Sequence, residues 1–270
     1  MTFIANARMY SVAPEAEAAW KALIAHVGDE AGVPLSYLPY PAPQPLERLW
    51  ALPDLGCVFM CGFPLALGMA DVEPLAAPVP SLPWAEGRPV YRSDFIVRAD
   101  SPFRTLEDTF GHRFGWTAAH SHSGFNAPRR HLSQMRTPGR QRLFSEVTGD
   151  LVTARAVLDA VRAGSIDVGP LDAFWHALAA RHRPELVADI RVVASTALAP
   201  IPALVASRSL SARDRAALRR ALAGAAGRPW FAAPARELLV AGFSPLARED
   251  YAPLLAWQEQ ARAAGYAAIA

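Results

Sequence analysis

Short apolar segments alternate with amphipathic ones along most of the chain, and this alternation predicts an α/β fold. Residues 3–7 and 56–60 are apolar runs, and residues 35–40 form another strand-like segment. Between the segments 3–7 and 35–40, apolar residues recur at helical spacing, namely Trp20, Leu23, Ile24 and Val27. A short helix is expected at 46–50. Unbroken apolar strands joined by helices are typical of a parallel sheet that is buried on both faces.

A proline-rich stretch over residues 74–89 predicts an irregular connection, followed by a strand over 91–98. A second α/β unit then begins. Its expected strands are residues 113–117, 144–147, 166–169 and 190–194, and its expected helices include residues 153–163 and 171–180. Residues 201–207 are expected to return the chain to the first unit, and the tail is largely helical, with stretches at 212–224, 234–241 and 251–265. These units predict two lobes with a ligand cleft between them, lobe 1 being residues 1–98 plus 199–270 and lobe 2 residues 99–198.

Composition narrows the class of protein. The chain has 270 residues, of which 52% are hydrophobic and 19% charged, and this excludes a disordered chain. Its 27 basic and 25 acidic residues give a net charge of +2 and no general field that would attract nucleic acid. No run approaches the ~18 apolar residues of a membrane helix. We therefore expect neither a nucleic-acid partner nor membrane insertion.

The strongest candidate for chemistry is the polar turn Ser121-His122-Ser123-Gly124, between an expected strand and an expected helix. Backbone N–H groups at a helix N-terminus, together with two hydroxyls, can hold a phosphonate, phosphate, sulfonate or carboxylate. A serine here can also act only as a helix cap. His120 and His122 could share a metal ion, but no third ligand at a recognisable spacing supports that site. His122 is instead expected to contact the anion or to be a solvated loop residue.

Further candidates come from other strand ends. Asp172 follows an expected strand, where it can cap the next helix and also face a positive or hydroxyl group of a ligand. Tyr10 follows the first strand and is expected at the same rim of lobe 1. Tyr91 and Ser93 lie on the segment between the lobes, where their hydroxyls could reach the ligand. No spacing suggests a serine hydrolase or a dinucleotide site.

Several motifs together resemble a known family. They are Val90-Tyr-Arg-Ser-Asp-Phe-Ile-Val-Arg-Ala-Asp-Ser101, Gly111-His-Arg-Phe-Gly115, Ser121-His-Ser-Gly124, Ala163-Gly-Ser-Ile-Asp-Val-Gly-Pro-Leu-Asp172 and Gly242-Phe-Ser-Pro245. In order and spacing they resemble the phosphonate-binding proteins of ABC importers, the phosphate/phosphite/phosphonate group of substrate-binding proteins. The resemblance implies a type II periplasmic-binding-protein fold that closes on its ligand. It also implies anion binding by Ser121, His122 and Ser123, with Asp172 and Tyr10 on the ligand.

Two positions depart from the family pattern. His122 stands where the family has threonine, and Leu151 stands where it has an anion-binding histidine. A sulfonate, a carboxylate or a pyrimidine-type thiamine precursor therefore remains an alternative ligand.

The function implied by the resemblance is non-catalytic capture of a small anion, without cofactor or metal, by a monomer that hands its ligand to an ABC permease. The family acts in the periplasm, but the first residues lack the pattern of a signal peptide. The alternative is a cytoplasmic sensor or enzyme on the same fold, for example one that handles a thiamine-precursor pyrimidine.

Overall fold

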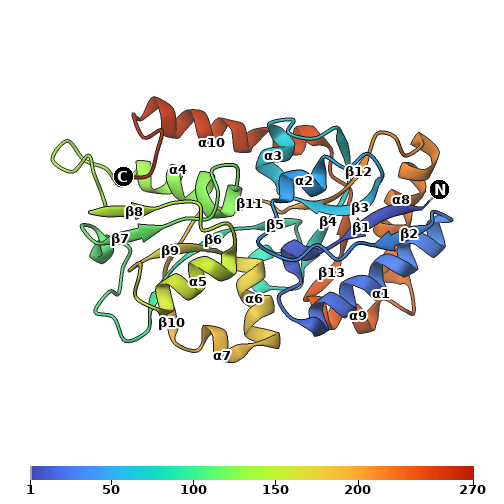
Figure 1. The fold of residues 1–270 in the computed structure, drawn as a ribbon, viewed down its shortest axis with the longest axis horizontal. Coiled ribbons are helices and arrows are strands. Elements are labelled where there is room, and N and C mark those ends of the chain that lie inside the picture. Colours follow the sequence, from blue (N-terminus) through green and yellow to red (C-terminus); the bar gives the residue numbers. More distant parts are fainter. Residues whose placement is uncertain (1) are drawn as a thin grey trace.

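The computed structural model describes residues 2–270 and confirms the α/β organisation (Figure 1). The larger sheet has the strand order β13-β4-β12-β3-β1-β2. Its strands in chain order are β1 (Phe3–Asn6), β2 (Leu35–Tyr37), β3 (Leu55–Met60), β4 (Val72–Pro80), β12 (Ala203–Ser207) and β13 (Val240–Ser244). Strand β1 pairs in parallel with β2 and β3, as the alternation of strands and helices predicts. Strand β12 pairs antiparallel with β3 and β4, so the late segment does return to the first sheet.

A second sheet with the order β10-β6-β9 forms the other half of the molecule, on the left of Figure 1. It consists of β6 (Ser93–Arg98), β9 (Gly169–Asp172) and β10 (Ile190–Ser195), and beside it β7 (Arg113–Gly115) pairs with β8 (Glu146–Thr148). The short pair β5 (Val90–Tyr91) and β11 (Ala199–Pro200) lies where the chain crosses between the halves.

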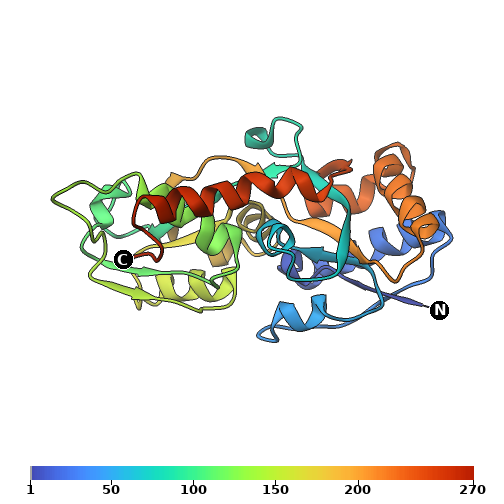
Figure 2. The ribbon, with the colours of Figure 1, turned by 90° about the horizontal axis from the view of Figure 1, so that it is seen from above.

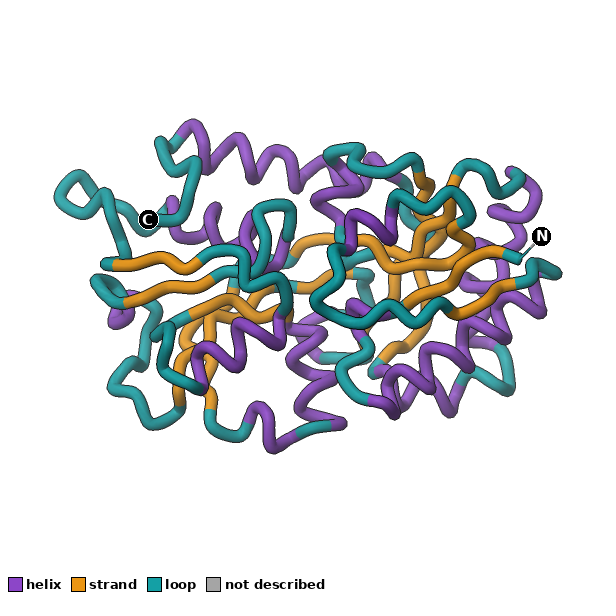
Figure 3. The backbone as a smooth tube through the Cα atoms, viewed as in Figure 1, coloured by secondary structure: helices purple, strands orange, loops and turns teal. Residues whose placement is uncertain are grey.

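Helices cover both sheets (Figure 3). The first half carries α1 (Pro14–Ala31), α2 (Leu46–Trp50), α3 (Gly62–Ala66), α8 (Ala212–Gly224) and α9 (Ala232–Leu238). The second carries α4 (Ala127–Ser133), α5 (Ala154–Arg162), α6 (Ala173–His182) and α7 (Pro184–Val187). The last helix, α10 (Ala252–Ala263), runs across both halves (Figure 2). Beyond it, Tyr266 and Ile269 are buried in the core of the second half, so the C-terminal segment joins the two.

The region 74–89 is only in part the irregular connection that its prolines predict, because turns and a short 3-10 helix occupy residues 81–89 but a strand precedes them. Strand β4 occupies residues 72–80 and lies between β12 and β13 in the large sheet. Proline lacks the N–H that a sheet uses, yet its fixed φ fits extended backbone, and strands tolerate it beside irregular pairing. The pairing of β4 shifts register near Pro74 and again near Pro80. The buried run Leu75-Ala76-Ala77 holds the strand in the core.

The predicted strand over 91–98 is divided at Arg92. Residues before it pair with β11, whereas Ser93–Arg98 pair with β9 and β10 of the second sheet. Sheet membership therefore places β6 with the second half, although the predicted lobe 1 extended to residue 98. The change of partner follows from the crossover itself, because one extended segment runs from one sheet to the other.

Other element boundaries move by a few residues. The strand expected at 166–169 is β9 at Gly169–Asp172, and the strand expected at 144–147 is β8 at Glu146–Thr148. The helix expected over 234–241 ends at Leu238, where positive φ at Leu239 starts the turn into the unpredicted strand β13. None of the helices in residues 2–270 combines the length and hydrophobicity needed to cross a membrane.

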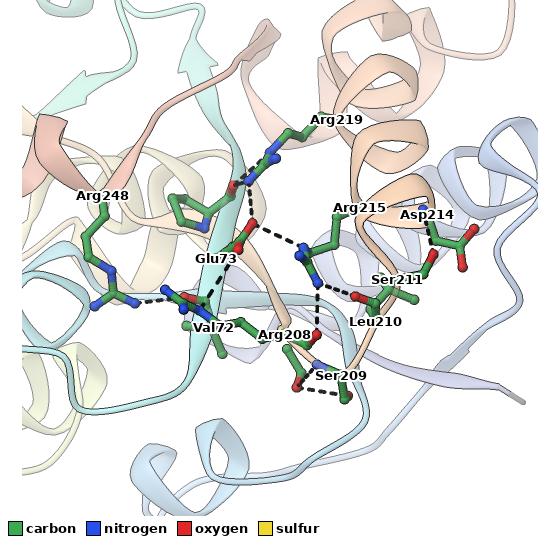
Figure 4. Close-up of polar contacts among 12 residues, drawn as sticks. Val72, Glu73, Arg208, Ser209, Leu210, Ser211, Asp214, Arg215, Arg219 and Arg248 are labelled. Atoms are coloured by element: carbon green, nitrogen blue, oxygen red, sulfur yellow. Dashed lines mark hydrogen bonds and ion pairs between the residues drawn. The ribbon is translucent and has the colours of Figure 1, made fainter.

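Glu73, near the start of β4, forms ion pairs with two arginines of helix α8 (Figure 4). Its carboxylate contacts Arg215 at 3.1 Å and Arg219 at 3.2 Å, and Arg208 lies at 3.9 Å. Arg219 also donates a hydrogen bond to the Pro74 carbonyl, so it binds the backbone of β4 as well as the Glu73 carboxylate. This cluster stabilises the outer side of the first half.

Candidate ligand-binding site

A cavity of about 590 Å³ is lined by residues from both halves of the molecule. The first half contributes the segment after β1 and the loop from Tyr37 to Trp50. The second half contributes residues 117–124, residues 152–155 and Asp172 at the end of β9. Volumes of ~300–1,000 Å³ are typical of sites for small organic molecules. Loops that follow strands line the cavity on both sides, where the sequence predicts a ligand.

The polar turn of the sequence forms one wall. Ser121 has extended backbone and caps a short π-helix at His122–Asn126, which continues directly into α4. The Ser121 Oγ accepts a hydrogen bond from the Gly124 N–H at 3.0 Å. Both Ser121 and Ser123 line the cavity. Ser121 is thus a helix cap, as one interpretation predicted, and it also faces the space where a ligand would lie.

Thr117 adds a hydroxyl that the sequence analysis did not single out. Its side chain lines the cavity and is 6% exposed, yet its Oγ1 has no hydrogen-bond partner in the described chain. Gly124 lets this hydroxyl approach, since a Cβ built at Gly124 would lie 1.8 Å from Thr117 Oγ1. A buried hydroxyl without a partner is costly, so this atom is suited to bind something that enters the cavity.

Asp172 lies on the cavity and is held by three donors. Its Oδ1 accepts from the Phe174 and Trp175 N–H groups, at 2.9 and 3.0 Å, as the N-cap of α6. Its Oδ2 accepts from the Tyr10 hydroxyl at 3.2 Å. Burial raises the pKa of Asp172 to about 7, although these hydrogen bonds oppose the shift. Capping and exposure to the ligand space therefore coexist at this residue.

Tyr10 reaches the site only through Asp172. Its ring is packed edge-on against Phe59 and Phe174, with centroids 5.1 and 4.9 Å away, and it does not line the cavity. Burial raises the pKa of Tyr10 well above its usual value. The structure thus makes Tyr10 a support for Asp172 where direct packing on the ligand was expected.

Tyr91, Ser93 and His122 also lie behind the cavity wall. The Ser93 hydroxyl donates to the Ser123 carbonyl at 2.8 Å and so fixes the turn. The Tyr91 hydroxyl is buried without a hydrogen-bond partner in residues 2–270. None of the three is among the residues that line the cavity. They therefore lie one layer behind the cavity lining, where direct contact with a ligand was predicted.

The two histidines of the turn point to different surroundings. The His122 ring lies 5.2 Å from the Trp257 ring, and its Nδ1 is 3.3 Å from Asn126 Nδ2. Burial lowers the pKa of His122 to about 3, so it carries no charge at neutral pH. His120 lines the cavity, and its Nδ1 lies 3.1 Å from the carboxylate of Glu47 in α2 of the first half. Because His122 is buried and does not line the cavity, it has neither the place on the cavity nor the solvated position that the sequence predicts, whereas His120 is partly exposed.

Arg8 is a second residue that sequence reasoning missed. It follows β1, lines the cavity and lies with its guanidinium 5.6 Å from the centre of the Tyr40 ring. The guanidinium donates to the Gln44 carbonyl, and within residues 2–270 it makes no ion pair with a carboxylate. Partial burial lowers the pKa of Arg8. Its position directly after a strand, two residues before Tyr10, was the available signal.

Comparison with solved structures places the fold. A binding-protein component of an ABC phosphonate transporter from Pseudomonas aeruginosa is 17% identical, with 97% of this chain and 88% of that chain covered and a TM-score of 0.80. PhnD1 from Prochlorococcus marinus, in complex with methylphosphonate, is 13% identical, with coverages of 97% and 98% and a TM-score of 0.79. A Xanthomonas citri protein bound to ATP is 21% identical, with both chains 98% covered and a TM-score of 0.65. These likenesses show the two-lobed periplasmic-binding-protein fold.

A search of curated proteins found no significant match. The family model for ABC-transporter phosphonate periplasmic substrate-binding proteins, however, matches residues 10–251. That span includes both sheets apart from β1, and every cavity-lining segment except Asn6, Arg8 and Met9. The chain therefore belongs to the family of periplasmic substrate-binding proteins of phosphonate ABC transporters.

Proposed function

We propose that this chain captures a small organic oxyanion, with a phosphonate as its reference ligand, in the cavity between two lobes. One lobe is built on the large sheet and the other on the sheet of β6, β9 and β10. Closure around the ligand would create the form that an ABC permease recognises, because a ligand that contacts both lobes favours the closed state. The chain would act in this way as a monomer in the periplasm.

The observation that carries the proposal is the unpartnered hydroxyl of Thr117 beside the Ser121–Gly124 turn. Thr117 Oγ1 is buried at the cavity and lacks a hydrogen-bond partner in the described residues. Ser121 and Ser123 line the same wall, where a continuous helical segment begins at His122. Hydroxyl donors and the positive end of a helix together favour an oxyanion. Thr117, Ser121 and Ser123 offer uncharged hydroxyl groups, which suits a ligand bound by hydrogen bonds.

Asp172 would bind the part of the ligand that donates or accepts a proton. With a pKa near 7, its carboxyl group can accept from an amine or hydroxyl, or donate to an oxyanion when protonated. Tyr10 would hold the carboxyl in place through the 3.2 Å hydrogen bond. Ser93 would act in the same indirect way on Ser123, whereas Tyr91 and His122 would form the packed base of the turn.

The surroundings favour capture over catalysis. Cys61 is the thiol at the cavity, and burial raises its pKa, which disfavours the nucleophilic thiolate. His122 is not on the cavity, so it cannot act as its base. The family is also a class of transport proteins and not of enzymes. The cytoplasmic sensor or enzyme considered from the sequence therefore gains no support.

The function can be tested by isothermal titration of the purified chain with methylphosphonate, inorganic phosphate, methanesulfonate, acetate and a thiamine-precursor pyrimidine. We expect a phosphonate to bind more tightly than acetate and the pyrimidine. In Gly124→Ala the new methyl group would displace Thr117 Oγ1, so binding should be lost. Ser165→Ala, on the exposed side of the same lobe, is the matched control and should bind as the unaltered chain does. Failure of every anion to bind would contradict the proposal.

A further inference from the structure

The positively charged side chain of Arg8 lines the cavity on the lobe opposite the wall formed by Thr117, Ser121 and Ser123. Arg8 comes from the first lobe, directly after β1, whereas Thr117, Ser121 and Ser123 belong to the second. We propose that Arg8 binds a second acidic group of the ligand, which would then be an organic molecule with a phosphonate-type group and a separate carboxylate or similar acid. This inference rests on the proposed function and specifies the class of ligand.

The hydrogen bonding of Arg8 leaves donors free. A guanidinium has five N–H donors and does not lose its charge at physiological pH. One nitrogen of Arg8 donates to the Gln44 carbonyl, and the Tyr40 ring covers one face of the group. These contacts fix the direction of the side chain without neutralising it. Partial burial disfavours the charge of Arg8, and Glu47 acts on it only through space, without an ion pair. An anion in direct contact with the guanidinium would therefore be stabilised.

Neighbouring charges are already compensated. Arg155, the other arginine on the cavity wall, pairs with Asp159 at 2.8 Å. The His120 Nδ1 lies 3.1 Å from the Glu47 carboxylate, and Glu17 pairs with Lys21 at 3.0 Å. Among the arginines and lysines that line the cavity in residues 2–270, Arg8 is therefore the one without a carboxylate partner. A ligand acid would complete the pairing.

The size and walls of the cavity fit a spacer between two acids. A volume of about 590 Å³ belongs to the range of organic ligands and exceeds the need of a bare oxyanion. Met9, Tyr37 and Trp50 supply apolar surface on the same lobe as Arg8. A short hydrocarbon spacer could pack there while its ends contact opposite lobes. Such a ligand would link the lobes by a charged contact on each side.

Titration with paired ligands tests the proposal. Phosphonoacetate and phosphonopropionate are compared with ethylphosphonate and propylphosphonate, which keep the spacer but lack the second acid. We expect at least one diacid to bind about tenfold more tightly than its alkyl partner, the difference that one good charge-assisted contact supplies. Arg8→Gln should abolish this preference and leave the affinity for alkylphosphonates within about threefold. The matched control is Arg162→Gln, which changes a partly exposed arginine that pairs with Asp189 and does not line the cavity; this variant should keep the preference.

Each contrary outcome has a separate meaning. If alkylphosphonates and diacids bind equally, or if Arg8→Gln keeps the preference, the inference about Arg8 is wrong while phosphonate capture stands. If Arg8→Gln weakens both kinds of ligand equally, Arg8 binds the same oxyanion as the turn, and the second acid is also refuted. If no phosphonate of either kind binds the unaltered chain, the proposed function itself fails, and the inference fails with it.

Discussion

The Tyr10 hydroxyl donates a hydrogen bond to Asp172 Oδ2 across 3.2 Å, joining residues 162 positions apart in the sequence. The bond links the segment after β1 in the first half to the end of β9 in the second. Both residues are buried, but Asp172 lines the cavity and Tyr10 lies behind it. The contact therefore connects the position of the ligand-facing carboxyl with the relative position of the two halves.

Asp172 should make folding stability depend on pH. Its pKa is raised from 3.8 to about 7, so the folded chain keeps this proton over a range in which the unfolded chain loses it. The proton on Asp172 thus adds at most about 4 kcal/mol to the free energy of unfolding. This contribution is fully present below about pH 4 and is lost as the pH rises towards 7. Urea unfolding at pH 5 and pH 8 should show this loss in the unaltered chain and a smaller one in Asp172→Asn. Parallel pH profiles for the two would contradict the buried, proton-binding carboxyl.

His122 should act in the opposite direction. Burial lowers its pKa from 6.5 to about 3, so on acidification the unfolded chain takes up a proton that the folded chain refuses. Stability from this residue is full above pH 6.5 and falls by about 3 kcal/mol on reaching pH 4. His122→Gln should unfold with less dependence on pH between 6.5 and 4, as measured by urea titration at several pH values. An unchanged acid slope would mean that His122 is accessible to protons in the folded chain.

Thr117→Val separates ligand binding from folding. Valine has nearly the shape of threonine, and the hydroxyl it removes has no partner in the described chain. The free protein should therefore melt at the same temperature or slightly higher, while affinity for the phosphonate falls about tenfold or more. Calorimetric melting and titration of one preparation give both values. A destabilised protein with full affinity would show that the hydroxyl serves the fold instead.

Glu73→Gln should affect stability alone. It would leave Arg208, Arg215 and Arg219 close together without their shared carboxylate (Figure 4). The pairs are partly exposed, so we expect a loss of about 1–2 kcal/mol that becomes smaller at high salt. Ligand affinity should not change, because none of these residues lines the cavity. Equal stability in low and high salt would argue against a role for the charges.

The sequence predicted most of the α/β architecture, because the pattern of buried apolar residues decides where strands and helices form. The apolar run ending at Met60 could only be a covered strand, and the return of residues 201–207 followed from their apolar character. Strand β4 was missed because local proline content outweighed the buried Leu75-Ala76-Ala77 run that tertiary packing uses. Local sequence carries no information about the neighbouring strands that make such prolines tolerable.

The site was predictable only in part. Ser121, Ser123 and Asp172 were found because helix starts after strands place polar groups at the cavity. Tyr10, Tyr91, Ser93 and His122 were expected at the ligand but lie behind the cavity lining, since sequence position gives the end of a strand but not the direction of a side chain. Arg8 was missed for a similar reason. Its importance depends on the absence of a carboxylate partner, which only the three-dimensional arrangement shows.

The most direct test of phosphonate capture is a crystal structure of the chain with the phosphonate that titrates most tightly. We predict that the phosphonate oxygens lie within hydrogen-bond distance of Thr117 Oγ1 and of Ser121 or Ser123, with Asp172 on another side of the ligand. A phosphonate bound outside this cavity, or inside it with Thr117 Oγ1 still lacking a partner, would contradict the account.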